Sequence, residues 1–228
     1  MPMVSVIGAR AFSGCRMLQS GDLGSNLRRI GDEAFRGCVS LTSITLPSSL
    51  QSIGRAAFRD CTELSCVELE DGITSLSPSL FRGCLSLAEI VFAHTLREIP
   101  VGAFRDCSAL EQLSLPSSIE RIGAHAFEGC RGKIKITLPN TVTTVHSCAF
   151  SKCPSLCYAE IPASMKKFSF DIFKGCRELT DLFYDGTKAD FSSLERASAA
   201  FSNGKRWDDG MGSYTVHCLD GKLERKRK

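Results

Sequence analysis

The residues of this sequence with the widest chemical repertoire are its cysteines, which number twelve among 228 residues. Thiols can pair as disulfides, bind metal ions or act as nucleophiles. Eight of them recur at intervals of 23 residues, and we call these the ladder cysteines: Cys15, Cys38, Cys61, Cys84, Cys107, Cys130, Cys153 and Cys176. Metal sites need clustered ligands such as Cys-x-x-Cys pairs, whereas this spacing provides one thiol per repeat with no histidine in register. We therefore predict no metal site and no cofactor.

Disulfides between successive ladder cysteines are also disfavoured. Equivalent side chains of stacked repeats point in parallel and lie about 4.8 Å apart at Cβ, whereas a disulfide needs about 3.8 Å. We expect a structural ladder of small, buried, reduced side chains whose thiols donate weakly to backbone carbonyls.

The remaining cysteines do not indicate catalysis: Cys66, Cys148, Cys157 and Cys218. Cys66 precedes the inward-facing Val67 and is therefore expected to be exposed and the most reactive. No histidine can be placed beside a cysteine from its position in the repeat, and the sequence lacks Gly-x-Ser-x-Gly, a phosphate-binding loop and His-Glu-x-x-His. Glu68 and Glu89 are like-charged neighbours on an open surface without a cleft that excludes water. We predict no catalytic residue and no enzymatic activity.

The elements that position the ladder cysteines follow from the same repeat. A phenylalanine precedes each ladder cysteine by three residues, from Phe12 to Phe173. Written from its cysteine, the unit is C-x-x-L-x-x-I-x-L-P-x-x-L-x-x-I-G-x-x-A-F-x-x. In the second copy, Ile44 and Leu46 alternate with polar residues, which indicates a short half-buried strand ended by Pro47. Each unit is predicted to be one strand, a turn and an irregular or 3₁₀ return segment.

A unit of this size cannot bury its apolar positions alone, so neighbouring units must stack as coils around one shared core. Equivalent strands then form a parallel sheet on one face of a solenoid. The composition, with 43% hydrophobic residues and a net charge of +3, suits a folded chain. No apolar run approaches the roughly 18 residues of a membrane span, and the near-neutral charge without interleaved aromatic residues argues against nucleic acid. We predict neither membrane insertion nor nucleic-acid binding.

The pattern L-x-x-I-x-L-P-x-x-L resembles the leucine-rich repeat core, and the unit with I-G-x-x-A-F-x-x-C is similar to the BspA-like class of bacterial surface proteins, of spirochaete type. The resemblance covers residues 6 to about 186. It implies an α/β-type leucine-rich repeat solenoid and a non-enzymatic protein-binding or adhesion module. It also implies a bacterial cell-surface, periplasmic or extracellular location and a host matrix or cell-surface protein as partner. Two positions depart from the pattern, with Lys133 in place of Leu41 and Gly21 in place of Ile44.

The two ends of the chain differ. Residues 1–186 are predicted to form about eight coils, and residues 187–228 a C-terminal capping segment, with a helix, a hairpin and a basic tail. The helix start is indicated by Thr187 and Asp190. Residue 1 enters part-way through a repeat and no signal peptide is visible. We expect either that the natural protein begins upstream or that the uncapped N-terminal edge pairs with another copy, which would make the protein a self-associating structural element.

The outward positions of the predicted sheet vary while the core is constant, as in a scaffold that presents a recognition face. Tyr158 and Phe183 are candidate aromatic anchors, although Phe183 could instead pack against the cap. The predicted partner-binding residues on this concave face are Glu68, Glu89, Gln112, Lys135, Tyr158, Glu160 and Phe183.

A second candidate surface is a stripe of arginines, each one residue after the repeat phenylalanine: Arg36, Arg59, Arg82 and Arg105. Stacked on the convex side, they could bind a polyanion or a sulfated glycan. Asp60 and Asp106 follow two of them and weaken the positive field, which favours an ordinary solvated face over a polyanion site.

Overall fold

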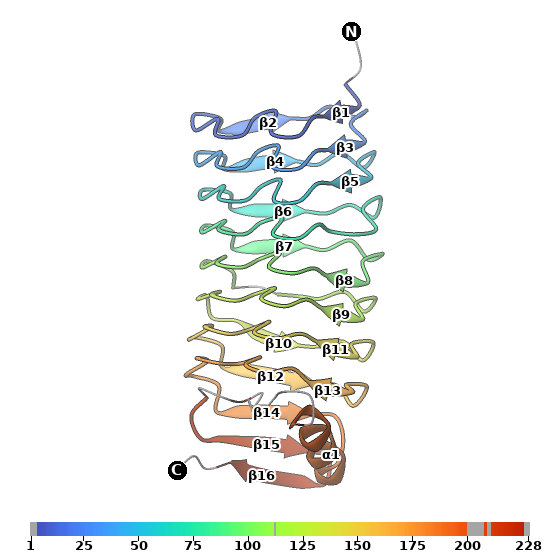
Figure 1. The fold of residues 1–228 in the computed structure, drawn as a ribbon, viewed down its shortest axis with the longest axis vertical. Coiled ribbons are helices and arrows are strands. Elements are labelled where there is room, and N and C mark those ends of the chain that lie inside the picture. The colour runs from blue at the N-terminus through green and yellow to red at the C-terminus, as the bar shows by residue number, and fades with distance from the viewer. Residues whose placement is uncertain (1–3, 112, 200–207, 209–210, 226–228) are drawn as a thin grey trace.

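A computed structural model describes residues 4–111, 113–199, 208 and 211–225. The chain winds into a solenoid whose coils stack along the long axis of the molecule, with the two termini at opposite ends (Figure 1). Every parallel strand pair between coils is offset by one repeat, as in Ser20 opposite Ser43 and Lys135 opposite Tyr158. The period read from the sequence is therefore the length of one coil.

The predicted strand lies on one face of the coils. Its central residue is buried and its flanking residues are exposed, as in β4, because successive side chains of a strand point to opposite faces. The strands of this first ladder are β2 (Ser20–Asp22), β4 (Ser43–Thr45), β6 (Cys66–Glu68), β7 (Glu89–Val91), β10 (Lys135–Thr137), β12 (Tyr158–Ile161) and β14 (Asp181–Tyr184).

The return segments contain a second parallel ladder, which the sequence did not predict. Its strands have two residues each, the first facing solvent or half-buried and the second buried, as in Ser52 and Ile53. They are β1 (Val6–Ile7), β3 (Arg29–Ile30), β5 (Ser52–Ile53), β8 (Glu98–Ile99), β9 (Arg121–Ile122), β11 (Thr144–Val145) and β13 (Lys167–Phe168). The part of the chain that the structure describes contains no 3₁₀ helix.

Between the second ladder and the ladder cysteine, each coil makes a tight bend that we call the arch. Arches contain two residues with left-handed backbone at fixed repeat positions, such as Glu33 at φ 55° and Gly37 at φ 71°. Alternate amides point along the solenoid axis and donate to the next coil, as Phe35 does to the carbonyl of Ala57 at 2.8 Å. The amides between them close turns within the arch, so this irregular backbone is hydrogen-bonded.

The core is a column of identical side chains. The repeat phenylalanines stack in parallel from Phe12 to Phe173, with ring centroids 5.2 to 5.9 Å apart. Beside them, each buried ladder thiol donates to the phenylalanine carbonyl of the preceding coil, as Cys107 Sγ does to Phe81 O at 3.2 Å. Rings and thiols therefore join every coil to its neighbour.

The two departures from the repeat are absorbed locally. Lys133 is exposed, and the adjacent Ile134 is buried in its place. Gly21 still pairs with Ile44 in β2 and β4, because the backbone ladder does not require a side chain.

The C-terminal segment covers the last coil, as Figure 1 shows. Helix α1 (Lys188–Ala199) is capped by the preceding Thr187, whose hydroxyl accepts a hydrogen bond from the amide of Asp190 at 3.2 Å. Strand β15 (Tyr214–Cys218) extends the first ladder beside β14 and pairs with β16 (Gly221–Arg225) in an antiparallel hairpin. This confirms the predicted solenoid with a helix-and-hairpin cap, while the proposed boundary between residues 186 and 187 stays a prediction. Among the described residues, no helix is both long and apolar enough to span a membrane.

The phenylalanine column predicts a position-dependent loss of stability. Phe104 is fully buried between two rings, whereas Phe12 is 41% exposed and stacks on one ring only. Phe104→Ala should lower the free energy of unfolding by about 3–5 kcal/mol. Phe12→Ala should lower it by about 1 kcal/mol. Urea unfolding followed by circular dichroism measures both, and equal losses would contradict a continuous column.

The buried thiols predict a loss of stability in alkali. Burial raises the pKa of Cys61 from 9.0 to about 12 and that of Cys84 and Cys107 well above its usual range. The folded protein keeps these protons while the unfolded chain releases them, so stability is full below about pH 9 and falls above it. The loss is about 1.4 kcal/mol per pH unit for each such thiol.

Urea midpoints measured between pH 8 and pH 10.5 in the presence of a reductant test this. The variant Cys84→Ala, Cys107→Ala is the matched control and should show a shallower dependence on pH. The same slope in both proteins would mean that other groups cause the alkaline loss.

Candidate functional site

The outward side chains of the first ladder form the face predicted to bind a partner. Glu68, Glu89 and Lys135 are exposed on it, and Tyr158, Glu160 and Phe183 are half-buried. Gln112, which was predicted as part of the same face, lies outside the described residues. The face is acidic around β6 and β7 and aromatic near the cap.

The strands of the first ladder pair in three groups, with breaks between β4 and β6 and between β7 and β10. Residues 113 and 114 occupy the strand position of the coil between β7 and β10, and residues 113–115 form no strand. Ser114 is exposed there and Leu115 is only half-buried. A hollow of about 310 Å³ lies between these residues and β7, and one of about 460 Å³ lies between them and β10.

We call these the β7 hollow and the β10 hollow. The β7 hollow is lined by Glu89, Ile90, Val91, Phe92, His94, Ser114, Leu115 and Pro116. The β10 hollow is lined by Leu113, Ser114, Leu115, Ser117, Lys135, Thr137 and Pro139. Ser114 and Leu115 line both, so the two hollows are neighbours on one face. The carboxylate of Glu89 lines the β7 hollow, and the ammonium group of Lys135 lines the β10 hollow. Val91, which is 46% exposed, adds an apolar edge to the β7 hollow. The structure thus places Glu89 and Lys135, but not Glu68, at one cleft region.

The aromatic residues of the face have a different arrangement. Tyr158 stacks on Phe183 with ring centroids 4.8 Å apart, and Phe183 stacks on His217 of β15 at 4.6 Å. The imidazole Nε2 of His217 lies 2.6 Å from Oδ1 of Asp181, and this hydrogen bond lowers the pKa of Asp181. Because the rings stand face to face, Phe183 packs against the cap, as the alternative interpretation of the sequence held.

His217 was not predicted as part of this face. It lies outside the 23-residue register, so its place beside Phe183 depends on how β15 pairs with β14, which periodicity does not determine. The hydroxyl of Tyr158 in turn donates to Glu160 Oε2 at 3.2 Å. Burial, together with the Glu160 carboxylate, raises the pKa of Tyr158.

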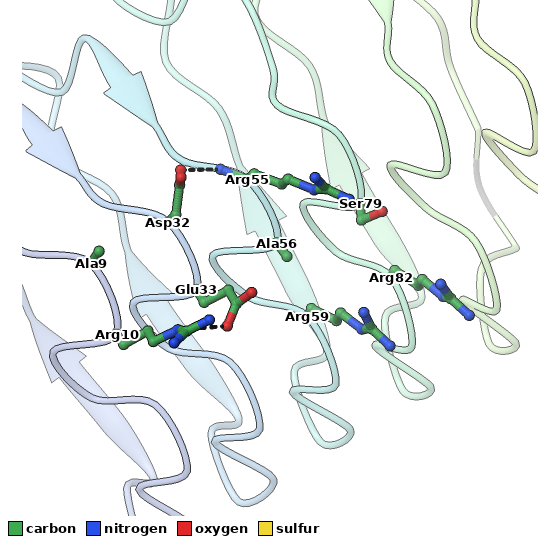
Figure 2. Close-up of a pocket in the computed structure, with 9 residues that line it drawn as sticks. All are labelled: Ala9, Arg10, Asp32, Glu33, Arg55, Ala56, Arg59, Ser79 and Arg82. Carbon is green, nitrogen blue, oxygen red and sulfur yellow. Dashed lines mark hydrogen bonds and ion pairs between the residues drawn. The ribbon is translucent and has the colours of Figure 1, made fainter.

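The arginine stripe is divided by its carboxylate partners. Arg36 donates to Glu33 at 3.3 Å, and Arg105 lies 3.3 Å from Glu128. Arg59 and Arg82 instead line a groove across the arches (Figure 2). The stripe is therefore not one uniform run of free positive charge.

The twelve cysteines are all free thiols, and the ladder cysteines are buried except for Cys15. The expectation that Cys15 is buried is wrong, because a neighbouring coil packs against it from one side only. Cys66 is exposed opposite Glu89 in the ladder. No group of three histidine, cysteine or carboxylate residues among those described could hold a metal ion.

The N-terminal coil, for which self-association was considered, exposes apolar side chains at Val4, Val6, Phe12 and Met17. Nothing in the structure tests whether they contact another copy, so self-association stays a prediction.

Comparison with known proteins agrees with this geometry. The sequence matches the family model for the BspA type leucine-rich repeat region over residues 5–131 and 97–203. The chain belongs to the BspA-type leucine-rich repeat family. The predicted family is thereby confirmed, and the coils described above are BspA-type repeats. No curated protein matches the chain.

Two solved structures of leucine-rich repeat proteins are similar to this BspA-type chain. One, from Bacteroides ovatus, is 31% identical with a TM-score of 0.51, over 69% of this chain and 35% of that one. The other, from T. pallidum, is 27% identical with a TM-score of 0.53, over 72% of each chain. The chain thus spans about a third of the B. ovatus protein, and its similarity to both supports the solenoid fold.

The aromatic stack predicts that the cap is anchored through Phe183. Phe183→Ala removes a ring that lies between Tyr158 and His217, so we expect the free energy of unfolding of this BspA-type protein to fall by about 1–3 kcal/mol. Thr45→Ala, at the same repeat position in an early coil, should change it by less than about 0.5 kcal/mol. Thermal unfolding measures both, and a neutral Phe183→Ala would show that the stack does not hold the cap.

Proposed function

We propose that this protein is a non-enzymatic binding module that presents the β7 hollow and the β10 hollow to a partner protein. The observation that supports this most directly is the pair of adjoining hollows at the break of the first ladder between β7 and β10. They combine the half-buried Leu115, the apolar edge at Val91 and oppositely charged walls at Glu89 and Lys135. Apolar centres with polar rims are the usual anatomy of a protein interface.

The residues that form the floor of the hollows indicate a rigid recognition surface. Leu113 and Phe92 line them from the buried core, so their floor is fixed by the stacked coils. A preorganised surface of this kind loses little conformational entropy on binding. The charges at Glu89 and Lys135 would orient a partner that carries the complementary pair.

The family supports the biological setting that we propose. We infer a role in protein interaction or adhesion, with a bacterial cell-surface, periplasmic or extracellular location. The partner would be a protein ligand such as a host matrix or cell-surface protein. Tyr158 and Glu160 lie on the same face and would contact a partner that extends from the hollows toward the cap.

Ser114 provides the test, because it lines both hollows. Ser114→Arg places a long cation in the middle of the surface, so we expect at least a tenfold loss of affinity for any matrix or cell-surface protein that the wild type binds. Binding is measured by surface plasmon resonance against a panel of purified proteins of these classes.

Ser52→Arg is the matched control, since Ser52 is an exposed serine of β5 on the second ladder. It should bind like the wild type. The proposal fails if Ser114→Arg binds normally or if both variants lose affinity equally. A photo-crosslinking residue at position 114, but not at position 52, should also capture the bound protein.

A further inference from the structure

The groove shown in Figure 2 lies on the arches and is separate from the hollows of the first ladder. It has a volume of about 550 Å³ and is lined by Ala9, Arg10, Asp32, Glu33, Arg55, Ala56, Arg59, Ser79 and Arg82. Ala56 and Ser79 occupy the first left-handed position of their arches, where the neighbouring coil has Glu33 and a later coil has His125. The short side chains at this position leave the space that forms the groove.

Two guanidinium groups enter the groove from adjacent coils. Arg59 and Arg82 directly follow Phe58 and Phe81, whose ring centroids are 5.6 Å apart. The backbones of the two arginines are therefore separated by about the distance between adjacent coils. Figure 2 shows them extending in the same direction from neighbouring arches, and Arg55 contributes a third cation. Parallel like charges at this distance repel one another unless a negative group neutralises them.

Neither carboxylate that lines the groove forms an ion pair with Arg55, Arg59 or Arg82. Asp32 accepts from the backbone amide of Arg55 at 2.8 Å, and Glu33 accepts from Arg10 at 3.0 Å. The hydrogen bonds from Arg10 and Arg36 lower the pKa of Glu33, which stays ionised and engaged.

The nearest carboxylates outside the groove make poor contacts with the two parallel arginines. Asp60 Oδ2 lies 3.2 Å from Nε of Arg59, yet that buried Nε has no hydrogen-bond partner because the alignment is unsuitable. Asp106 Oδ2 lies 3.9 Å from Nε of Arg82. The guanidinium group of Arg55 forms no hydrogen bond or ion pair with the described residues. Three cations therefore share one groove without a well-placed anion.

We propose that this groove binds a compact tetrahedral oxyanion, the phosphate or sulfate group of a monoester, between Arg59 and Arg82 with Arg55 beside it. Guanidinium groups donate in a fork that fits such oxyanions, and two of them can share one tetrahedral group. The site is independent of the proposed protein-binding face.

The distribution of charge favours a compact anion over a long polyanion. Beyond the groove, Arg36 is paired with Glu33, and Arg105 with Glu128. Glu128 itself occupies the stripe position of the next coil and also binds Lys152 at 2.7 Å. The free cations thus span two coils, which limits the site to one anionic group.

The test uses glucose 6-phosphate and glucose 6-sulfate as probes in isothermal titration calorimetry at low salt. We expect both to bind the wild type at pH 7.5. The variant Arg59→Gln, Arg82→Gln should bind at least tenfold more weakly, while Arg121→Gln, an exposed arginine paired with Glu98 on the second ladder, should bind like the wild type. Lowering the pH to 5 should weaken only the phosphate ester, because its second ionisation has a pKa of about 6. The pH dependence separates the two sources of the anion.

A second variant guards against loss of folding in the double substitution. Aspartate tolerates left-handed backbone, so Ser79→Asp should fold normally. The variant places a carboxylate in the groove and should therefore also abolish binding. The inference is overturned if neither monoester binds, or if Ser79→Asp and the double variant bind as the wild type does. It is also overturned if only heparin binds and Arg36→Gln weakens it as much as Arg82→Gln, which would indicate the polyanion stripe instead.

Discussion

The rest of this structure depends on one constraint, which is that each side chain of the core packs against its own copy in the next coil. Parallel rings such as Phe104 and Phe127, 5.4 Å apart, stack only if the chain returns to the same place after 23 residues. A single coil has no core of its own, so burial is supplied by its neighbours. The fixed perimeter also explains the arches, since turning within so few residues requires left-handed backbone. That conformation costs about 1–2 kcal/mol at a residue other than glycine, and the axial hydrogen bonds and the core offset this cost.

Periodicity predicted those features that repeat with one residue type, and missed those that do not. The strand around Ile44, the phenylalanine column and the cysteine ladder all follow from positions occupied by similar residues in most coils. The second ladder was missed because two-residue strands are too short to show alternation. The first left-handed position of the arch was missed because residues as different as glutamate, alanine, serine and histidine occupy it, so it lacks a consistent glycine signature. The hollows were missed because the Leu115 coil keeps the repeat pattern at its first-ladder position although residues 113–115 form no strand. His217 was missed because it lies outside the register.

Division of labour within the coil explains how the two proposed binding surfaces can coexist. The core positions hold the coils together, which leaves the outward residues of the first ladder and of the arches free to vary without loss of the fold. On the first ladder, variation produces a cleft region with opposite charges at Glu89 and Lys135. On the arches, small residues at Ala56 and Ser79 open a groove between cations. Both surfaces are defined by differences between adjacent coils, which a consensus of the repeat conceals.

The direction of the hydrogen bonds between coils has a mechanical consequence. These bonds run along the solenoid axis, and the two termini lie at opposite ends of that axis. Tension applied through the termini would therefore load the hydrogen bonds between a terminal coil and its neighbour first. It would not load the bonds of all the strands together in shear. A tethered molecule of this kind would lengthen in steps of one coil at modest force, and the α1–β16 cap at one end determines from which side the unravelling begins.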